Sequence, residues 1–225
     1  MGIAALLRAA GVGAGDEVVV PAFGNVEVAR AVMLAGALPV FADIDPATYC
    51  LDPSAVGAAL TPRTAAVVAV HRFGHPADLG QLRALGQRRG LLVLEHAELD
   101  ASRDETARRR ERAAYLDARL RGVRTPGGGA GHSYQQYVVR VPGNGRPDRD
   151  AFARAVRAKG VACRIPVPTP THRLPELRRD VSLPETERAA DETLALPVDG
   201  SLTKRDMQRT ASVCNALGGL LAPAL

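Results

Sequence analysis

The sequence predicts an α/β fold in which a parallel sheet with helices on both faces is followed by a smaller α+β domain. In the first hundred residues, short apolar runs alternate with amphipathic stretches. The runs are apolar at successive positions, which is typical of strands that are buried on both faces. After about residue 100 this alternation gives way to a long Arg-rich stretch, a single strand pattern and further helical patterns. The change indicates a second domain.

The first half contains four predicted strands, at 17–20, 38–44, 64–70 and 91–94. The predicted helices lie between them, at 26–34, 52–60 and 78–89. Gly36 and Gly90 follow two of these helices, where a glycine commonly ends a helix. Pro53 stands at the first helical position of another, where its missing N–H costs nothing. Each of the three predicted helices therefore has a residue that marks its beginning or its end.

The second half is predicted to contain a helix over 102–122, a strand over 134–141 and a helix over 148–159. An extended Pro-rich segment follows at 165–170, and two helices, at about 185–195 and 203–219, complete the pattern. We expect three parts: a truncated large α/β domain at 1–101, a connecting Arg-rich helix at 102–124, and a small α+β domain at 125–225.

Composition limits the classes of partner. The net charge is +5, and 27 of the 29 basic residues are Arg, which is typical of a GC-rich genome. The densest basic stretch, 103–124, also holds four acidic residues and an apolar helical stripe, so it is interpreted as a solvated helix face and not as a nucleic-acid site. No apolar run reaches the length of about 18 residues that a membrane helix needs. Three widely spaced cysteines fit a reduced, cytoplasmic setting.

Three groups of motifs resemble the DegT-type sugar aminotransferases. The first is GVGAGDEVVVPAF at 11–23 with AGALPVFADIDPATYCLDP at 35–53. The second is TPRTAAVVAVHRFGHPADL at 61–79 with GLLVLEHA at 90–97, and the third includes SYQQYVVRV at 133–141 and LPETERAADETLALPV at 183–198. The resemblance implies a fold-type I scaffold, pyridoxal phosphate (PLP), nucleotide-linked keto-sugar substrates, and dimers whose sites lie at the subunit interface.

The departures from this family concern the cofactor. The resemblance implies a phosphate-binding Gly-Thr turn where this sequence begins Met1-Gly2-Ile3, a stacking aromatic where it has Asn25, and a ring-nitrogen carboxylate where it has His96. The block with the Schiff-base lysine should follow Glu98, but the Arg-rich helix follows instead. The two lysines, Lys159 and Lys204, lie in solvated helical patterns. We therefore expect no bound cofactor and no lysine-based PLP chemistry.

The carboxyl ends of parallel strands are where α/β sheets bind ligands. His71 and His96 end neighbouring strands, so we expect their imidazoles to converge and to perform acid–base catalysis with Glu95 and Glu98. The alternative is that each of these residues only caps a strand end. Contacts with a small-molecule substrate, sugar-like or another metabolite, are expected from four further residues: Asn25, Arg72, Arg164 and His172. No His or Cys spacing predicts a metal site.

Two functions stay open at this point. The first is a PLP-independent enzyme of specialised-metabolite biosynthesis that catalyses cyclisation, dehydration or isomerisation. The second is a non-catalytic pseudo-aminotransferase that binds a partner such as a full-length homologue. The strand at 91–94 would lack its family neighbour, and an unpaired edge is usually covered. The cover would be the 102–122 helix, a rearranged strand such as 134–141, or a second subunit, and we expect a homodimer.

Overall fold

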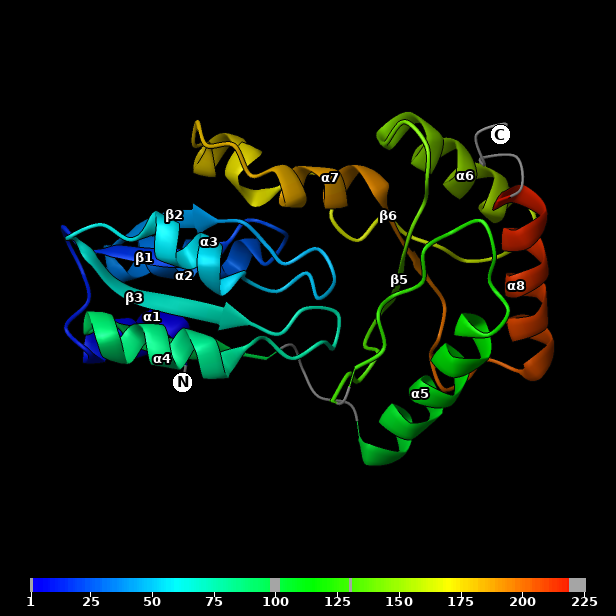
Figure 1. The fold of residues 1–225 in the computed structure, drawn as a ribbon, viewed down its shortest axis with the longest axis horizontal. Helices are drawn as coiled ribbons and strands as arrows, with labels where there is room; N and C mark the ends of the chain where they lie inside the picture. The colour runs from blue at the N-terminus through cyan, green and yellow to red at the C-terminus, as the bar shows by residue number, and fades with distance from the viewer. Residues whose placement is uncertain (1, 98–101, 130, 219–225) are drawn as a thin grey trace. The chain divides into compact units, whose positions relative to one another are not determined.

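The computed structural model describes residues 2–97, 102–129 and 131–218. They form two compact units (Figure 1). Unit 1 comprises Met1–Arg72, Pro76–Glu98 and Thr169–Glu187, and unit 2 comprises Phe73–His75, Leu99–Pro168 and Arg188–Leu225. Glu98 falls outside the described residues.

Unit 1 contains the predicted parallel sheet. Its strands are β1 (Glu17–Pro21), β2 (Leu38–Ala42), β3 (Thr64–Val70) and β4 (Leu92–His96), in the order β2-β1-β3-β4. All neighbours are parallel, and the register sets Val19 opposite Val40 and Val70 opposite His96. Every residue of β1 is buried, as the continuous apolar run predicted. The predicted fold class is therefore confirmed.

Helices cover both faces of this sheet. On one face α1 (Ile3–Ala9) and α2 (Val26–Ala35) bury Leu7 and Val32 against β1 and β3. On the other face α3 (Pro53–Ala59) and α4 (Leu79–Arg89) bury Val56 and Leu82. The side chains of Asp52 and Asp78 accept hydrogen bonds from backbone N–H groups in the first turns of α3 and α4, which satisfies donors that have no partner inside the helix.

A segment from the second half of the sequence belongs to unit 1. Residues 169–187 contain two 3₁₀ turns, η1 (Thr171–Arg173) and η2 (Pro175–Leu177), and the start of α7 (Pro184–Glu192). Leu177 and Leu183 are buried in the core beside α1 and α2. The Asp43 carboxylate, at the end of β2, accepts the backbone N–H groups of Glu185 and Thr186 at 3.0 and 2.8 Å. The compact units therefore do not follow the expected domain boundaries.

Unit 2 is an α+β unit with a two-stranded antiparallel sheet. Its strands are β5 (Tyr137–Arg140) and β6 (Thr193–Leu196), and its long helices are α5 (Arg103–Asp117), α6 (Arg146–Ala158) and α8 (Lys204–Gly218). Ala113 and Leu116 of α5 are buried in the same core as Tyr137. The Arg-rich helix is thus part of this unit, and it ends at Asp117 rather than near 122.

Two expectations about the sheets need correction. The predicted helix over 185–195 ends at Glu192, because Thr193–Leu196 pairs with β5. β5 pairs with β6 and not with β4, so a rearranged strand at 134–141 does not cover the edge of β4. Within the described residues, β4 pairs only with β3. The other two ways of covering this edge stay predictions.

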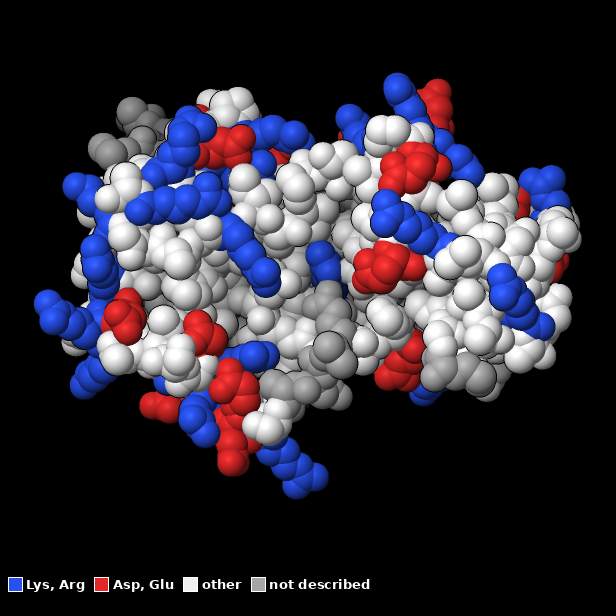
Figure 2. All heavy atoms as spheres, turned by 180° about the vertical axis from the view of Figure 1, so that it is seen from behind, with Lys and Arg blue, Asp and Glu red and all other residues white. Residues whose placement is uncertain are grey.

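No helix in the described ranges is long and apolar enough to cross a membrane. On the face of the molecule in Figure 2, the basic side chains lie singly or in small groups with acidic side chains among them.

Candidate active site at the carboxyl edge of the sheet

The loop after β1 forms the centre of the candidate site in unit 1. Asn25 precedes α2 with a left-handed backbone (φ 57°), and only 6% of the residue is exposed. Arg72, just beyond β3, donates from Nη1 to Asn25 Oδ1 at 2.5 Å. Asn25 Nδ2 is buried, and the described residues offer it no acceptor. An unsatisfied buried donor costs about 1–3 kcal/mol, so the site is suited to a ligand oxygen at this position.

The Phe23 ring lies beside the Arg72 guanidinium. Its central carbon lies 5.7 Å from the centre of the Phe23 ring, within the range of a cation–π contact. Phe23 in turn stacks on Tyr49, with 5.6 Å between ring centres. Arg72 is only 8% exposed. The guanidinium and the Asn25 amide are therefore fixed donors beside the N-terminus of α2, where the helix dipole favours an anion.

Thr171 fixes this loop from the 169–187 segment. Its backbone N–H donates to the carbonyl of Ala22 at 2.8 Å, and its hydroxyl donates to the carbonyl of Gly24 at 2.9 Å. Thr171 is fully buried. These bonds hold the backbone on the N-terminal side of Asn25. No local sequence pattern marked Thr171, because its partners lie about 150 residues earlier in the chain.

His71 and Glu95 form the second part of the edge. His71 Nδ1 accepts the backbone N–H of Ala77 at 2.9 Å, so in the neutral imidazole Nε2 carries the proton. Nε2 lies 2.8 Å from a Glu95 oxygen, and the other Glu95 oxygen accepts from Arg83 at 3.0 Å. This chain orients His71. It also leaves the imidazole without a free lone pair, so His71 is a poor general base.

His96 does not converge with His71. Successive side chains on a strand point to opposite faces, and Glu95 points towards His71. His96 therefore points to the other face of the sheet, and the hydrogen bond between the two histidines is from the backbone N–H of His71 to the carbonyl of His96. On this geometry we no longer expect the two imidazoles to converge. Glu98, the remaining candidate acid–base residue, lies outside the described residues.

The two remaining candidates for substrate contact lie elsewhere. His172 is 1% exposed, its Nε2 lies 3.4 Å from Glu187, and its ring is tilted against Phe41 in the core of unit 1. Burial lowers the pKa of this imidazole. His172 is a core residue, and the expectation that it contacts substrate is wrong. Arg164 is exposed in unit 2, where it lines a cavity of about 290 Å³.

The fold and this edge can be compared with known proteins. The model of the DegT/DnrJ/EryC1/StrS aminotransferase family matches residues 1–98 and 96–217. The chain belongs to this family. The L-glutamine:scyllo-inosose aminotransferase of Streptomyces griseus is 50% identical over 93 residues, which are 41% of this chain and 22% of that protein. The UDP-N-acetyl-3-dehydro-alpha-D-glucosamine 3-aminotransferase of Acidithiobacillus ferrooxidans is 47% identical over 89 residues, or 40% and 24%.

The chain thus spans about a fifth of the length of the curated relatives it matches. A solved structure has the same fold over more of its length. The aminotransferase TlmJ from Streptoalloteichus hindustanus superimposes with a TM-score of 0.85 at 26% identity, covering 97% of this chain and 83% of that one.

These relatives overturn the functions expected from the sequence. Both curated relatives are named aminotransferases, and each shares about half of its residues with this chain over the matched stretch. The expectations of a PLP-independent enzyme and of a non-catalytic scaffold are therefore wrong. Those expectations rested on four departures from the family pattern, namely the phosphate-binding turn, Asn25, His96 and the missing lysine block, and these outweighed the similarity of the remaining sequence.

PLP and its amine form, pyridoxamine phosphate, are the cofactors that this family implies. The unsatisfied Asn25 amide and the Arg72 guanidinium beside α2 fit an anionic, phosphorylated group held without a covalent bond. A covalent link would need a lysine, and Lys159 and Lys204 are both exposed residues of unit 2. The residues of unit 1 therefore fit the non-covalent part of cofactor binding.

Proposed function

We propose that the chain aminates the keto group of a cyclitol or a nucleotide-linked sugar, with pyridoxamine phosphate held non-covalently at the carboxyl edge of unit 1. The observation that carries this proposal is the 50% identity to the scyllo-inosose aminotransferase, together with the family match over both halves of the chain. The chain's own residues supply binding and orientation.

Asn25 and Arg72 would bind the anionic end of the cofactor. Asn25 Nδ2 needs an acceptor, and a phosphate oxygen would remove the cost of about 1–3 kcal/mol that the buried donor carries. Arg72 adds a charged donor, and bonds to charged groups are stronger than neutral ones. Thr171 holds the loop, so both donors are in place before the ligand arrives.

His96 would contact the pyridine nitrogen of the cofactor. The resemblance places it where the family has its ring-nitrogen carboxylate. It is half-buried at the end of β4. His71 is a positioning residue here, because Ala77 and Glu95 occupy its two nitrogens.

The cofactor needs no lysine to be held for a single amino transfer of this kind. When bound, pyridoxamine phosphate supplies the nitrogen and two electrons to the keto carbon and leaves as the aldehyde. Arg72 and Asn25 would hold it throughout. A protein without a Schiff-base lysine would still bind the cofactor and complete one turnover.

The test is a single-turnover assay on the full chain with pyridoxamine phosphate and scyllo-inosose. The expected result is the amino-cyclitol, detected by mass spectrometry, in an amount that does not exceed the bound cofactor. Arg72→Gln and Asn25→Gly should abolish it; glycine tolerates the left-handed backbone at this position. Arg154→Gln is the matched control, since Arg154 is exposed on α6 of unit 2. Bound cofactor without amino product would refute the proposed reaction.

We also infer that a second subunit covers the edge of β4 that has no strand partner among the described residues, in a homodimer or in a heteromer with a full-length homologue. An unpaired edge strand exposes a row of N–H and C=O groups, and Leu92 and Leu94 on β4 are only half-buried. Light scattering should give a mass of at least twice the chain's 23.7 kDa. A monomer at micromolar concentration would contradict this.

A further inference from the structure

Unit 2 contains a cavity that the proposed reaction does not use. Its volume is about 570 Å³, and it lies between α5 and the start of α8. Three of the residues that line it are cationic, namely Arg112, Arg119 and Lys204, and one, Glu111, is acidic. Small-molecule sites measure about 300–1,000 Å³. The cavity is therefore large enough for a ring with one charged substituent.

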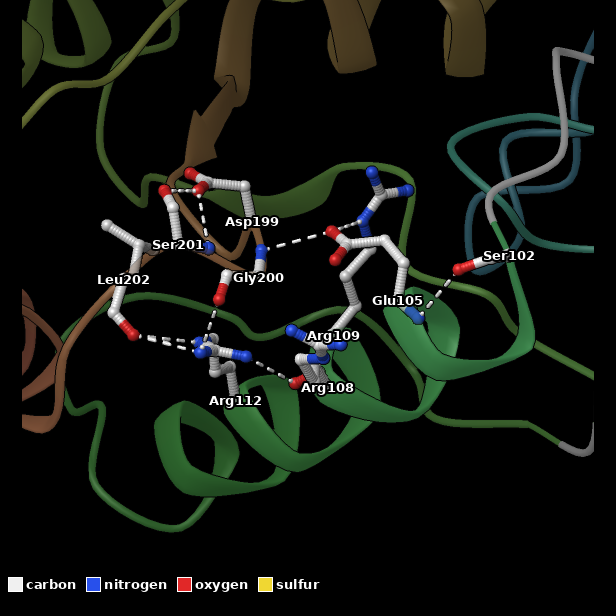
Figure 3. Close-up of polar contacts among 9 residues, drawn as sticks. All are labelled: Ser102, Glu105, Arg108, Arg109, Arg112, Asp199, Gly200, Ser201 and Leu202. Carbon is white, nitrogen blue, oxygen red and sulfur yellow. Dashed lines mark hydrogen bonds and ion pairs between the residues drawn. The ribbon is translucent and has the colours of Figure 1, made fainter.

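The three cations have no carboxylate partner among the residues that the structure describes. Arg112 donates to the carbonyls of Arg108, Gly200 and Leu202 (Figure 3), and its charge helps to lower the pKa of the Asp199 carboxyl. Arg119 stacks on Tyr115 at 3.8 Å and donates to a backbone carbonyl. Lys204 is exposed. Glu111 is the acidic residue of the lining, and Asp206 bonds to the lining residue Thr203. The positive charge that remains for a ligand is therefore that of Arg119 and Lys204.

The wall of the cavity is fixed before any ligand binds. In Figure 3, Arg112 of α5 reaches the loop at 199–202, with Nη2 at 2.9 Å from both Gly200 O and Leu202 O. Two turns earlier, Glu105 accepts the backbone N–H of Gly200 at 3.0 Å and pairs with Arg109. The loop that leads into α8 is therefore held on α5 by two side chains that are two turns apart. Preorganised donors lose less entropy on binding.

The cavity also has an apolar side. Tyr115, Leu202 and the buried Met207 line it together with the cations. The N-terminus of α8 is already capped, because the Asp206 carboxylate accepts the backbone N–H and the hydroxyl of Thr203 at 2.9 and 2.6 Å. We propose that this cavity binds a phosphorylated ring compound, with its phosphate on Arg119 and Lys204 and its ring against Tyr115 and Met207. The site lies within unit 2, and the inference does not depend on the proposed function.

The test uses the full chain and three simple probes: phenyl phosphate, inorganic phosphate and phenol. Titration followed by amide chemical shifts should show phenyl phosphate binding at 112–119 and 202–207, with inorganic phosphate weaker and phenol weaker still. Lys204→Gln and Arg119→Gln should each raise the dissociation constant for phenyl phosphate about tenfold. Lys204→Arg should stay within about twofold of the original chain, since it keeps the charge.

Arg154→Gln removes the same charge from an exposed position outside the cavity and should leave binding unchanged. Lys204 and Arg119 are exposed, so the variants should keep the thermal transition of the original chain, which circular dichroism checks. Equal binding by Lys204→Gln and the original chain would overturn the proposal. So would an equal loss in Arg154→Gln, or phenol binding as tightly as phenyl phosphate.

Discussion

Removal of the Asp43 carboxylate should loosen the 169–187 segment from unit 1. Its oxygens accept from the backbone N–H groups of Ile44, Glu185 and Thr186 and from the Thr186 hydroxyl, at 2.7–3.0 Å. The last three bonds cap the N-terminus of α7 over a separation of more than 140 residues. Asp43→Ala therefore loses a helix cap, worth about 0.5–2 kcal/mol, and leaves the fully buried Thr186 hydroxyl without its acceptor, at about 1–3 kcal/mol.

We expect a loss of about 2–4 kcal/mol in the free energy of unfolding, measured by urea denaturation. The matched control is Asp52→Ala, because Asp52 caps α3 through Ser54 only two residues away; its loss should be about 1 kcal/mol. Hydrogen exchange should also accelerate at Glu185 and Thr186 in Asp43→Ala but not in Asp52→Ala. An Asp43→Ala cost no larger than that of Asp52→Ala would refute the role given to this carboxylate.

Three more predictions concern the titration of His132, the hydrogen bonds from Arg112 to the 199–202 loop, and the cysteine thiols. Burial, with the nearby His75 and Arg110, lowers the pKa of His132 to about 4. The folded protein favours the neutral imidazole, so the free energy of unfolding should fall as pH falls from about 6.5 to 4, by at most about 3 kcal/mol. His132→Gln should flatten this pH dependence, measured by urea denaturation at each pH. The same pH dependence in the variant and the original chain would contradict the prediction. Arg112→Met should lower the free energy of unfolding by about 1–3 kcal/mol and weaken phenyl phosphate binding. If neither quantity changes, the hydrogen bonds from Arg112 to the 199–202 loop contribute nothing. Burial raises the pKa of Cys50 to about 11 and of Cys214 to about 12, so iodoacetamide at pH 8 should modify half-buried Cys163 before either; peptide mass mapping checks the order, and early modification of Cys214 would contradict it.

The sheet of unit 1 was predictable because its signals are local. Thr64–Val70 was predicted with the bounds that the structure has, since a buried parallel strand leaves a continuous apolar run. The helix ends at Gly36 and Gly90 followed from the same kind of signal, as both glycines have a positive φ.

The errors arose where distant residues decide the structure. Thr193–Leu196 is a strand because β5 pairs with it, and nothing within those four residues specifies that partner. Leu177 and Leu183 were expected in the small domain but are buried in unit 1. Which segment a buried leucine packs against depends on the tertiary fold, so composition could not predict the domain boundaries.

The sequence predicted that the candidate residues lie at the carboxyl edge of the sheet, and His71 and Glu95 do lie there, but their contacts differ from those expected. Strand order placed His71, Glu95 and Arg72 together at the carboxyl ends. Side-chain alternation along β4 separates His96 from His71, and this depends on the register of the strand. The contact between Arg72 and Asn25 joins two loops that are 47 residues apart. No local sequence motif around either residue predicts this contact.

The central claim is that Asn25 and Arg72 hold a phosphorylated cofactor at the carboxyl edge of unit 1. Titration of pyridoxamine phosphate into the full chain, followed by calorimetry, tests this most directly. Arg72→Gln and Asn25→Gly should each raise the dissociation constant at least about tenfold, and Arg154→Gln should leave it unchanged. Equal affinity in all four proteins, or no binding by the original chain, would contradict the claim.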